Sequence, residues 1–443
     1  MGTSAVRPLN DEEVSRLPEA RAAMETAGQA GSSSRFNFFA AFDGTNNDKD
    51  NLELSGDPYP TNVGNLDDQA KDAESASFRR GYYPGVGTGG DQGNLINAGI
   101  NPTPAIDAAA GKAYVQFSDA ALKYLRTHPD ATPTDLGASV TGFSRGCTSA
   151  VRFAQLVNER GLVAPDGTVV AKPGSVPITA MALMDPVATG VQGELAVPPN
   201  VKGQVLVVQA EQENRSWFRP LDYSDDPRVV TVRHPGNHVG VGGGYDRNGT
   251  AANVHEGITA YFQRRGLPLA DVPPEQRHDP SQRPWLRTEA YQTARNGDVL
   301  TEDNGKPKAR WPLDDPDQPR VQVKPPMSEQ HKAWLRQAYT ELAPTLKTTG
   351  LSPEQCLQVS AACVASAAGH DGWGPPQRFL VSKDGERVAV QHQSGRFDEL
   401  RVDDSLRTST QNHLDRAQEA RDPVPGPQQE HAAPVRSEQA LAR

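Results

Sequence analysis

The sequence predicts an α/β protein of the α/β-hydrolase type, with a mostly parallel sheet that is covered by helices on both faces. Short apolar runs alternate with amphipathic stretches over the first half of the chain, as in parallel sheets with crossover helices. One of these runs leads directly into a G-x-S-x-G sequence at residues 142–146. An aspartate and a histidine follow later runs, in the order in which this fold carries its catalytic side chains. A small α+β module is expected near the C-terminus.

The expected strands are short apolar runs of four to nine residues. The first, residues 36–42, is stopped by the turn-forming sequence Asp43-Gly44-Thr45. Amphipathic stretches at residues 108–125 and 147–157 predict helices between the strands. The other expected strands are residues 136–141, 176–184, 205–210 and 229–232.

Composition shifts divide the chain of 443 residues, which is long enough for more than one domain. The beginning is polar and rich in Ser, Gly and Ala, and a later stretch is rich in Pro and charge. The end is rich in Pro, Gln and Glu, which is typical of disorder. The expected divisions are a flexible N-terminal arm or short helix (1–34), a catalytic domain (35–265), a Pro-rich linker with loops (266–325), an α+β module (326–419) and a disordered tail (420–443).

The α+β module is expected to contain two helices followed by a hairpin. Residues 329–346 have helical periodicity, and residues 352–368 begin with the capping sequence Ser-Pro-Glu-Gln. Residues 378–391 read as two strands that turn at Asp384-Gly385.

Charge and cysteine content exclude several classes of function. The net charge of −10 argues against a nucleic-acid partner and against electrostatic docking on anionic membranes. Three cysteines are too few for a disulfide framework, which indicates synthesis in a reducing bacterial cytoplasm, and Cys147 is expected to be a small buried residue. No run is long enough to span a bilayer, and the N-terminus lacks the apolar segment of a cleavable signal. Export therefore requires another kind of signal.

Ser144 is the expected nucleophile. It lies in Gly142-Phe143-Ser144-Arg145-Gly146, between an expected strand and an expected helix. This turn is so tight that small residues must flank the serine, and it lifts the hydroxyl above the sheet at a helix N-terminus.

A serine nucleophile needs a base, and the base needs a carboxylate that orients it. Asp185 follows the strand at residues 176–184, on the edge of the sheet where Ser144 also lies. His238 follows the last expected strand in a glycine-rich loop, which allows it to approach the serine. His234, at the end of that strand, is the alternative base, and His255 is expected to be a packing residue.

The oxyanion hole requires two backbone N–H groups near the nucleophile. Arg145 is expected to supply one, and the turn that contains Gly44 and Thr45 the other. An alternative is that Asp43, Asp48 and Asp50 bind a cation, although their spacing lacks the Gly and Glu pattern of an EF-hand. No metal and no cofactor are expected for this chemistry.

Seven motifs occur in an order that resembles the family of uncharacterised α/β-hydrolase domains that includes the phospholipase effectors of bacterial type VI secretion. The resemblance implies that Ser144, Asp185 and His238 form the catalytic triad and that Gly44 lies in the loop after the first strand. It also places Glu213 and Arg215 in the family's E-x-R stretch, where we interpret them as a structural ion pair. The region is compact beside the larger lipase effectors. The motifs are FFAAFDGTNND, TNVGNL, YYPGVGTGG, GFSRG, LMDPV, AEQENRSWFRP and HPGNHVGVGGGY.

The C-terminal part resembles the recruitment modules of bacteria-killing type IV secretion effectors. The resemblance rests on the sequence segments LSPEQCLQVSAACVASAAGHDG, RFLVSKDGERVAVQ and RVDDSL. Such modules bind the coupling ATPase of the secretion channel, so the resemblance implies a secretion coupling protein as a partner. A plain accessory domain is the alternative.

Together these observations predict a secreted antibacterial lipase effector that hydrolyses acyl esters of glycerophospholipids through an acyl-enzyme. The expected partners are the ester substrate, a coupling protein and a cognate immunity protein. The same machinery acting on a non-lipid ester is one alternative. A non-catalytic binding module on a hydrolase fold is another.

Overall fold

The computed structural model describes residues 6–28, 34–93, 100–245, 249–295, 298–313, 320–323, 328–370 and 372–420. The chain divides into two compact units, Met1–Pro326 and Met327–Arg443, and each is described by itself. The expected C-terminal module starts one residue before the second unit. The expected disordered tail lies outside the described residues, apart from residue 420.

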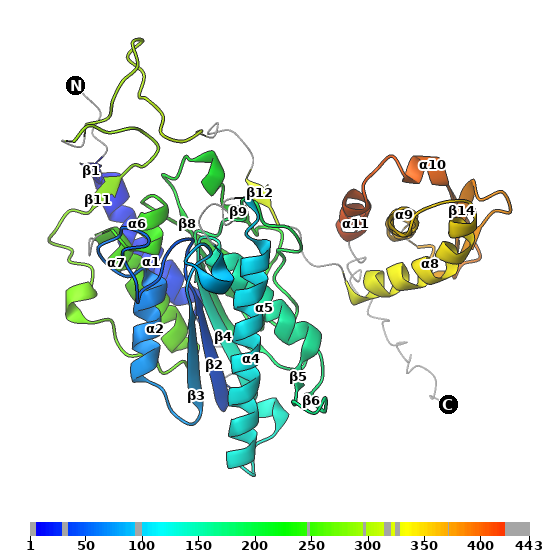
Figure 1. Ribbon diagram of the computed structural model, residues 1–443, viewed down its shortest axis with the longest axis horizontal. Helices are drawn as coiled ribbons and strands as arrows, with labels where there is room; N and C mark the ends of the chain where they lie inside the picture. Colours follow the sequence, from blue (N-terminus) through cyan, green and yellow to red (C-terminus); the bar gives the residue numbers. More distant parts are fainter. Residues whose placement is uncertain are drawn as a thin grey trace, which may run out of the picture. The chain divides into compact units, whose positions relative to one another are not determined.

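The first unit is built around a six-stranded sheet with the order β10-β8-β7-β4-β2-β3 (Figure 1). Every neighbouring pair in this sheet is parallel. The order reverses between β2 and β4, and ligands of open α/β sheets bind outside the carboxyl ends of the strands at such a point. The strands are β2 (Phe36–Phe42), β3 (Phe78–Tyr83), β4 (Leu136–Phe143), β7 (Ile178–Met184), β8 (Val205–Ala210) and β10 (Val229–His234).

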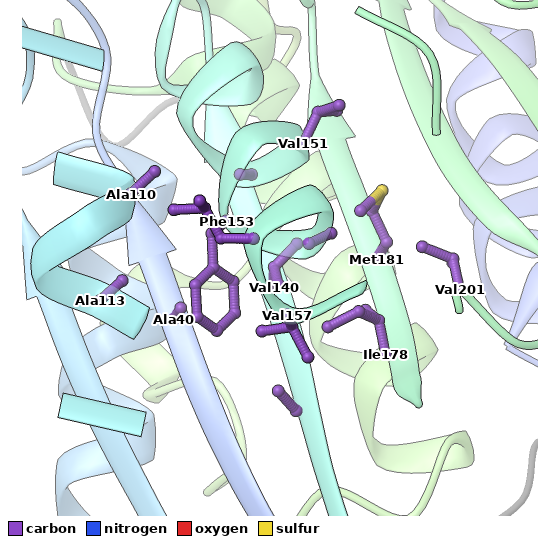
Figure 2. Packing of buried hydrophobic residues seen from close by; sticks show 14 of the residues in the cluster. Ala40, Ala110, Ala113, Val140, Val151, Phe153, Val157, Ile178, Met181 and Val201 are labelled. Atoms are coloured by element: carbon purple, nitrogen blue, oxygen red, sulfur yellow. The ribbon is translucent and has the colours of Figure 1, made fainter. Parts of the chain in front are cut away.

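Helices cover both faces of this sheet. Successive side chains of each strand point to opposite faces, and apolar residues are buried on both. Phe38 and Ala40 of β2 pack under α4 (Thr103–Thr127) and α5 (Gly146–Arg160). Figure 2 shows Phe153 of α5 lying among Ala40, Val140 and the alanines of α4. The opposite face, which includes Phe39 and Ala41, packs against α1 (Asp11–Ala27), α2 (Asn62–Asp72) and α7 (Gly249–Arg264). The expected α/β-hydrolase fold class is confirmed.

Of the two expectations for the N-terminal region, a flexible arm or a short helix, the structure shows the helix: residues 11–27 form α1. Asn10 and Glu13 form a capping box at its start. Met24 is buried in the core beneath α1. A side chain at Gly257 of α7 would meet Met24 at 2.8 Å, so this glycine permits the close approach of the two helices.

The Pro-rich stretch after α7 is packed on the first unit at several points, rather than being a free linker. β11 (Trp285–Arg287) pairs antiparallel with β1 (Val6–Pro8). β12 (Val321–Gln322) pairs with β9 (Leu221–Asp222), and Val323 joins the main hydrophobic core. Short elements complete the unit: α6 (His238–Gly242), β5 (Leu162–Val163), β6 (Val169–Ala171) and the 3-10 helices Gly90–Gln92, Pro133–Asp135, Ser216–Phe218 and Pro274–Gln276.

The second unit is a small α+β module, as expected. Its three-stranded antiparallel sheet has the order β13-β14-β15, and its core is formed by the helices and one face of this sheet. Among the described residues, no helix of either unit is long and apolar enough to cross a bilayer. The elements are α8 (Glu329–Thr348), α9 (Pro353–Ala368), β13 (Pro376–Val381), β14 (Arg387–His392), β15 (Phe397–Arg401), α10 (Val402–Ser405) and α11 (Thr410–Glu419).

Candidate active site

Ser144 lies at the sharp turn between β4 and α5. Its backbone φ is +55°, a conformation that is unfavourable for residues other than glycine. The flanking glycines have a steric reason, since a Cβ at Gly142 would lie 2.6 Å from the Gly146 carbonyl oxygen. A Cβ at Gly146 would lie 2.3 Å from the carbonyl oxygen of Phe42. The turn is therefore possible only with glycine on both sides, and its strain indicates a functional position.

Asp185 follows β7 and also has a positive φ, +41°. Its carboxylate is fully buried, and each oxygen accepts one hydrogen bond. Oδ1 accepts from the backbone N–H of Ala210 at 3.0 Å, and Oδ2 accepts from Nδ1 of His238 at 2.6 Å. The first bond fixes the carboxylate on β8, so that the second can fix the orientation of the imidazole.

His238 begins α6, and Asn237 caps this short helix. The ring lies between two aromatic side chains, with centroid distances of 4.6 Å to Phe143 and 4.9 Å to Phe218. Because Phe143 immediately precedes Ser144, this packing brings the imidazole beside the elbow. Among the described residues, neither the Ser144 hydroxyl nor Nε2 of His238 has a hydrogen-bond partner. Hydrogen bonds between a catalytic serine and its histidine are often long or misaligned when no substrate is bound.

The two other histidines of this region are held in the core. His234 is fully buried, and its ring nitrogens lie 2.9 Å from the Pro235 carbonyl oxygen and 3.0 Å from Oδ1 of Asn253. His255 contacts the side-chain oxygen of Gln69 at 2.8 Å. Burial lowers the pKa of both histidines to about 4, so they are neutral at pH 7. The structure thus brings His238, and not His234, to Asp185.

The turn after β2 lies against the elbow. The Arg145 guanidinium donates to the Thr45 hydroxyl at 3.4 Å. The Gly44 N–H donates to Oδ1 of Asp43 at 2.7 Å. This N–H group, which was one of the two expected from the turn for the oxyanion hole, is therefore already bonded. The Thr45 N–H has no hydrogen-bond partner among the described residues. Gly44 is needed for space instead, because a Cβ there would lie 2.6 Å from the Phe143 ring.

Asp43 anchors this turn from below. Its carboxylate accepts hydrogen bonds from Tyr82 at 2.7 Å, from Thr61 at 2.8 Å and from the Gly44 N–H. Burial raises the pKa of Asp43 to about 6, although these hydrogen bonds oppose the shift. The alternative of a cation at Asp43 is not supported by this geometry, because both oxygens already serve protein donors. No group of three His, Cys, Asp or Glu side chains suited to a metal occurs among the described residues.

Glu213 and Arg215 form the expected ion pair, and it belongs to a larger cluster. Arg215 is 4% exposed and binds Glu213 through two nitrogens, at 2.7 and 2.8 Å. Its third contact is Glu289, at 3.1 Å. The guanidinium stacks on the Phe218 ring at 3.6 Å, and that ring makes a T-shaped contact with the His238 ring. Glu213 also accepts a 3.4 Å hydrogen bond from the His238 backbone N–H. The cluster therefore supports both the ring and the backbone of His238.

The acidic members of the cluster respond differently to burial. Burial alone raises the pKa of Glu213, but the hydrogen bonds and charge of Arg215 bring it below its usual value. Burial raises the pKa of Glu289, and Arg215 opposes this only in part. Sequence reasoning missed Glu289, because it lies in a segment without periodicity. Phe218 was missed although it lies within a recognised motif, since an aromatic residue there carries no chemical signal of its own.

Comparisons with known proteins find only distant structural similarity. No protein-family model and no curated protein sequence matches the chain. A solved structure of the Tle1 effector bound to the VgrG spike of the type VI secretion system is 18% identical, with a TM-score of 0.35, over 49% of this chain and 52% of that chain. An uncharacterised protein from Pseudomonas aeruginosa is 16% identical, with a TM-score of 0.38, over 62% of this chain and 51% of that chain. Esterase PE8 is 12% identical, with a TM-score of 0.28, over 54% of this chain and 95% of that chain. The chain thus spans about half the length of the first two structures.

Proposed function

We propose that the first unit is a serine hydrolase of carboxylic esters, with Ser144 as nucleophile, His238 as base and Asp185 as the orienting carboxylate. The observation that carries this proposal is the 2.6 Å hydrogen bond between Asp185 and Nδ1 of His238, whose ring packs beside the strained elbow. A buried carboxylate on Nδ1 leaves Nε2 as the nitrogen that can take a proton from a serine hydroxyl.

The reaction follows from these positions. Ser144 Oγ attacks the ester carbonyl carbon and passes its proton to Nε2 of His238, and the carbonyl oxygen becomes an oxyanion. The N–H groups of Arg145 and Thr45 are proposed to bind this oxyanion. When the tetrahedral intermediate collapses, the bond to the leaving alcohol breaks and His238 protonates that alcohol. Water then attacks the acyl-enzyme with the same base, which releases the carboxylic acid and restores Ser144.

We propose acyl esters of glycerophospholipids as the substrate, so that the products are a fatty acid and a lysophospholipid. This choice is supported by the resemblance of the seven ordered motifs to the phospholipase effectors. A small soluble ester would use the same machinery. The strain at Ser144 and Asp185 argues against a non-catalytic binding module, because strained backbone persists mainly where function requires it.

The biological role is proposed to be that of an exported antibacterial toxin. The phrase RFLVSKDGERVAVQ, on which the resemblance to recruitment modules mainly rests, forms the β13–β14 hairpin of the second unit. In this proposal the second unit binds a secretion coupling protein, and an immunity protein protects the producing cell. A plain accessory role for the second unit is the alternative.

The test of the catalytic assignment is Ser144→Ala. We expect ester hydrolysis to fall by at least about 10³-fold with an unchanged circular dichroism spectrum, because only binding and oxyanion stabilisation then remain. A fluorophosphonate probe is expected to label the parent protein at Ser144. Ser15→Ala, at an exposed position of α1, is the control and should retain full activity. Labelling at another residue contradicts the assignment.

A further inference from the structure

Several large apolar side chains remain exposed around the candidate site. Ile100 is 76% exposed, Trp217 is 53% exposed and Leu313 is 37% exposed. We call these three residues, together with Val191 and Trp311, the apolar rim. Ile100, Val191 and Trp217 lie in the segments that follow β3, β7 and β8. Trp311 and Leu313 contact the segment that carries Trp217.

One half of the apolar rim surrounds the histidine. The rings of Trp217 and Trp311 are in contact, with centroids 5.6 Å apart. Leu313 forms a β-bridge with Arg215, which lies two residues before Trp217. The neighbouring Phe218 makes a T-shaped contact with the His238 ring. This half is therefore continuous with the residues that position the proposed base.

The other half lies on segments near the nucleophile and the turn after β2. The Thr189 hydroxyl donates to the Trp217 carbonyl oxygen, which joins the two halves. Val191 packs on a small apolar cluster that contains Val86 and Ala105. Ile100 lines a cavity of about 350 Å³ together with the same two residues.

Segments that carry the apolar rim contact the elbow and the turn after β2. The Val187 N–H donates to the Ser144 carbonyl oxygen at 3.3 Å, so the segment that carries Val191 borders the elbow. The Asn46 N–H donates to the Val86 carbonyl oxygen at 2.8 Å, directly after Thr45. A surface that rests on the rim therefore lies next to segments that contact the elbow.

We infer that the apolar rim binds a lipid surface by apolar insertion; this rests on the proposed function. A protein partner on the same residues would cover the segments that border Ser144, whereas a lipid surface would bring an ester to them. Tryptophan rings are also favoured at the boundary between headgroups and acyl chains. Because the chain carries a net charge of −10, attraction to anionic headgroups does not drive binding. Neutral phosphatidylcholine is therefore bound at least as well as anionic lipid, with little dependence on salt.

The experiment measures vesicle binding of the full chain in a Ser144→Ala background, so that the lipid is not consumed. Trp217→Ser and Ile100→Ser are compared with Val115→Ser and Val169→Ser. The two control residues are 57% and 56% exposed, on α4 and on β6, away from the rim. On phosphatidylcholine vesicles we expect each rim variant to lose at least about tenfold in partition coefficient, equivalent to about 1.4 kcal/mol. The controls are expected to bind like the parent.

Three results overturn the inference: no binding of the parent to phosphatidylcholine, binding that requires anionic lipid and low salt, or equal losses in rim and control variants. With Ser144 restored, the ratio of vesicle hydrolysis to hydrolysis of a soluble short-chain ester should fall in Trp217→Ser and stay constant in Val115→Ser. If the parent hydrolyses neither substrate, the proposed function fails. If it hydrolyses the soluble ester and the ratio is unchanged in Trp217→Ser, only the inference about the rim fails.

Discussion

The central sheet and the segment that follows α7 both contribute to the candidate site, but they do so by different means. β4 and β7 are buried on both faces, and their ends place Ser144 and Asp185. The described residues between 285 and 313 have few buried side chains; the β1–β11 pairing holds them on the unit, and Glu289 joins them to Arg215. Hydrophobic packing therefore fixes the reacting groups, whereas hydrogen bonds and charge attach the segment that supports His238.

The largest effect should separate two histidines of the sheet side. His238→Ala is expected to lower ester hydrolysis by at least about 10³-fold, because it removes the only imidazole bonded to Asp185 among the described residues. His234→Ala should retain most of the activity but unfold at lower denaturant concentration, since it leaves a cavity and unpaired polar groups. Initial rates and urea midpoints measure the two effects. An inactive, folded His234→Ala protein would show that the base is misassigned.

Truncation tests the contribution of the segment that follows α7. A chain ending at residue 326 retains the whole first unit and should keep ester hydrolysis within about threefold of the parent. A chain ending at residue 265 loses Glu289, the partner of β1 and the buried Val323, and should lose at least about 100-fold in activity or become insoluble. Equal activity of the two chains would break the comparison.

The chain that ends at residue 326 also tests the role of the second unit. If that unit is a recruitment module, this chain should hydrolyse phospholipid in detergent micelles yet fail to kill neighbouring bacteria when expressed in the producing strain. Undiminished killing rejects recruitment.

A smaller effect is expected from a single charge in the segment. Glu289→Gln removes one of the two carboxylates that hold Arg215, and we expect kcat to fall by about three- to tenfold with KM nearly constant. A matched control is Glu302→Gln in the exposed part of the same segment. An effect on stability alone, with kcat unchanged, assigns Glu289 a purely structural role.

Much of the sheet side could be predicted from sequence, because its strands are continuous apolar runs that end in chemically informative residues. β3 was missed, since it is an edge strand that exposes Arg79 and carries two consecutive arginines. For α1 the sequence left a flexible arm and a short helix open, because only five of its 17 residues are buried and its apolar pattern is weak. Glu289 could not be predicted, because its role depends on a tertiary contact with Arg215. The turn after β2 was expected to supply an oxyanion N–H from Gly44 or Thr45. The Gly44 N–H instead binds Asp43, a local hydrogen bond that the sequence does not reveal.

The smallest effect concerns the pH dependence of stability at Asp43. Its pKa in the folded protein is about 6, above the value of 3.8 for an unperturbed carboxyl. The folded state therefore takes up a proton before the unfolded state does, and folding becomes more favourable as pH falls from about 7 to about 4. Relative to Asp43→Asn, the parent should gain up to about 3 kcal/mol over this range. Urea unfolding of both proteins at several pH values measures the difference, and parallel curves contradict it.

Positive φ angles at Ser144 and Asp185 have a consequence for the order in which the protein fails. Both residues lie at the ends of neighbouring strands, and their conformations persist only while the surrounding loops remain packed. Opening these loops releases the strain without exposing the buried strands, whereas opening the sheet also loses their packing, so the local transition has the lower free energy. Inactivation should therefore precede global unfolding, with ester hydrolysis lost at a lower urea concentration than the circular dichroism signal of the sheet.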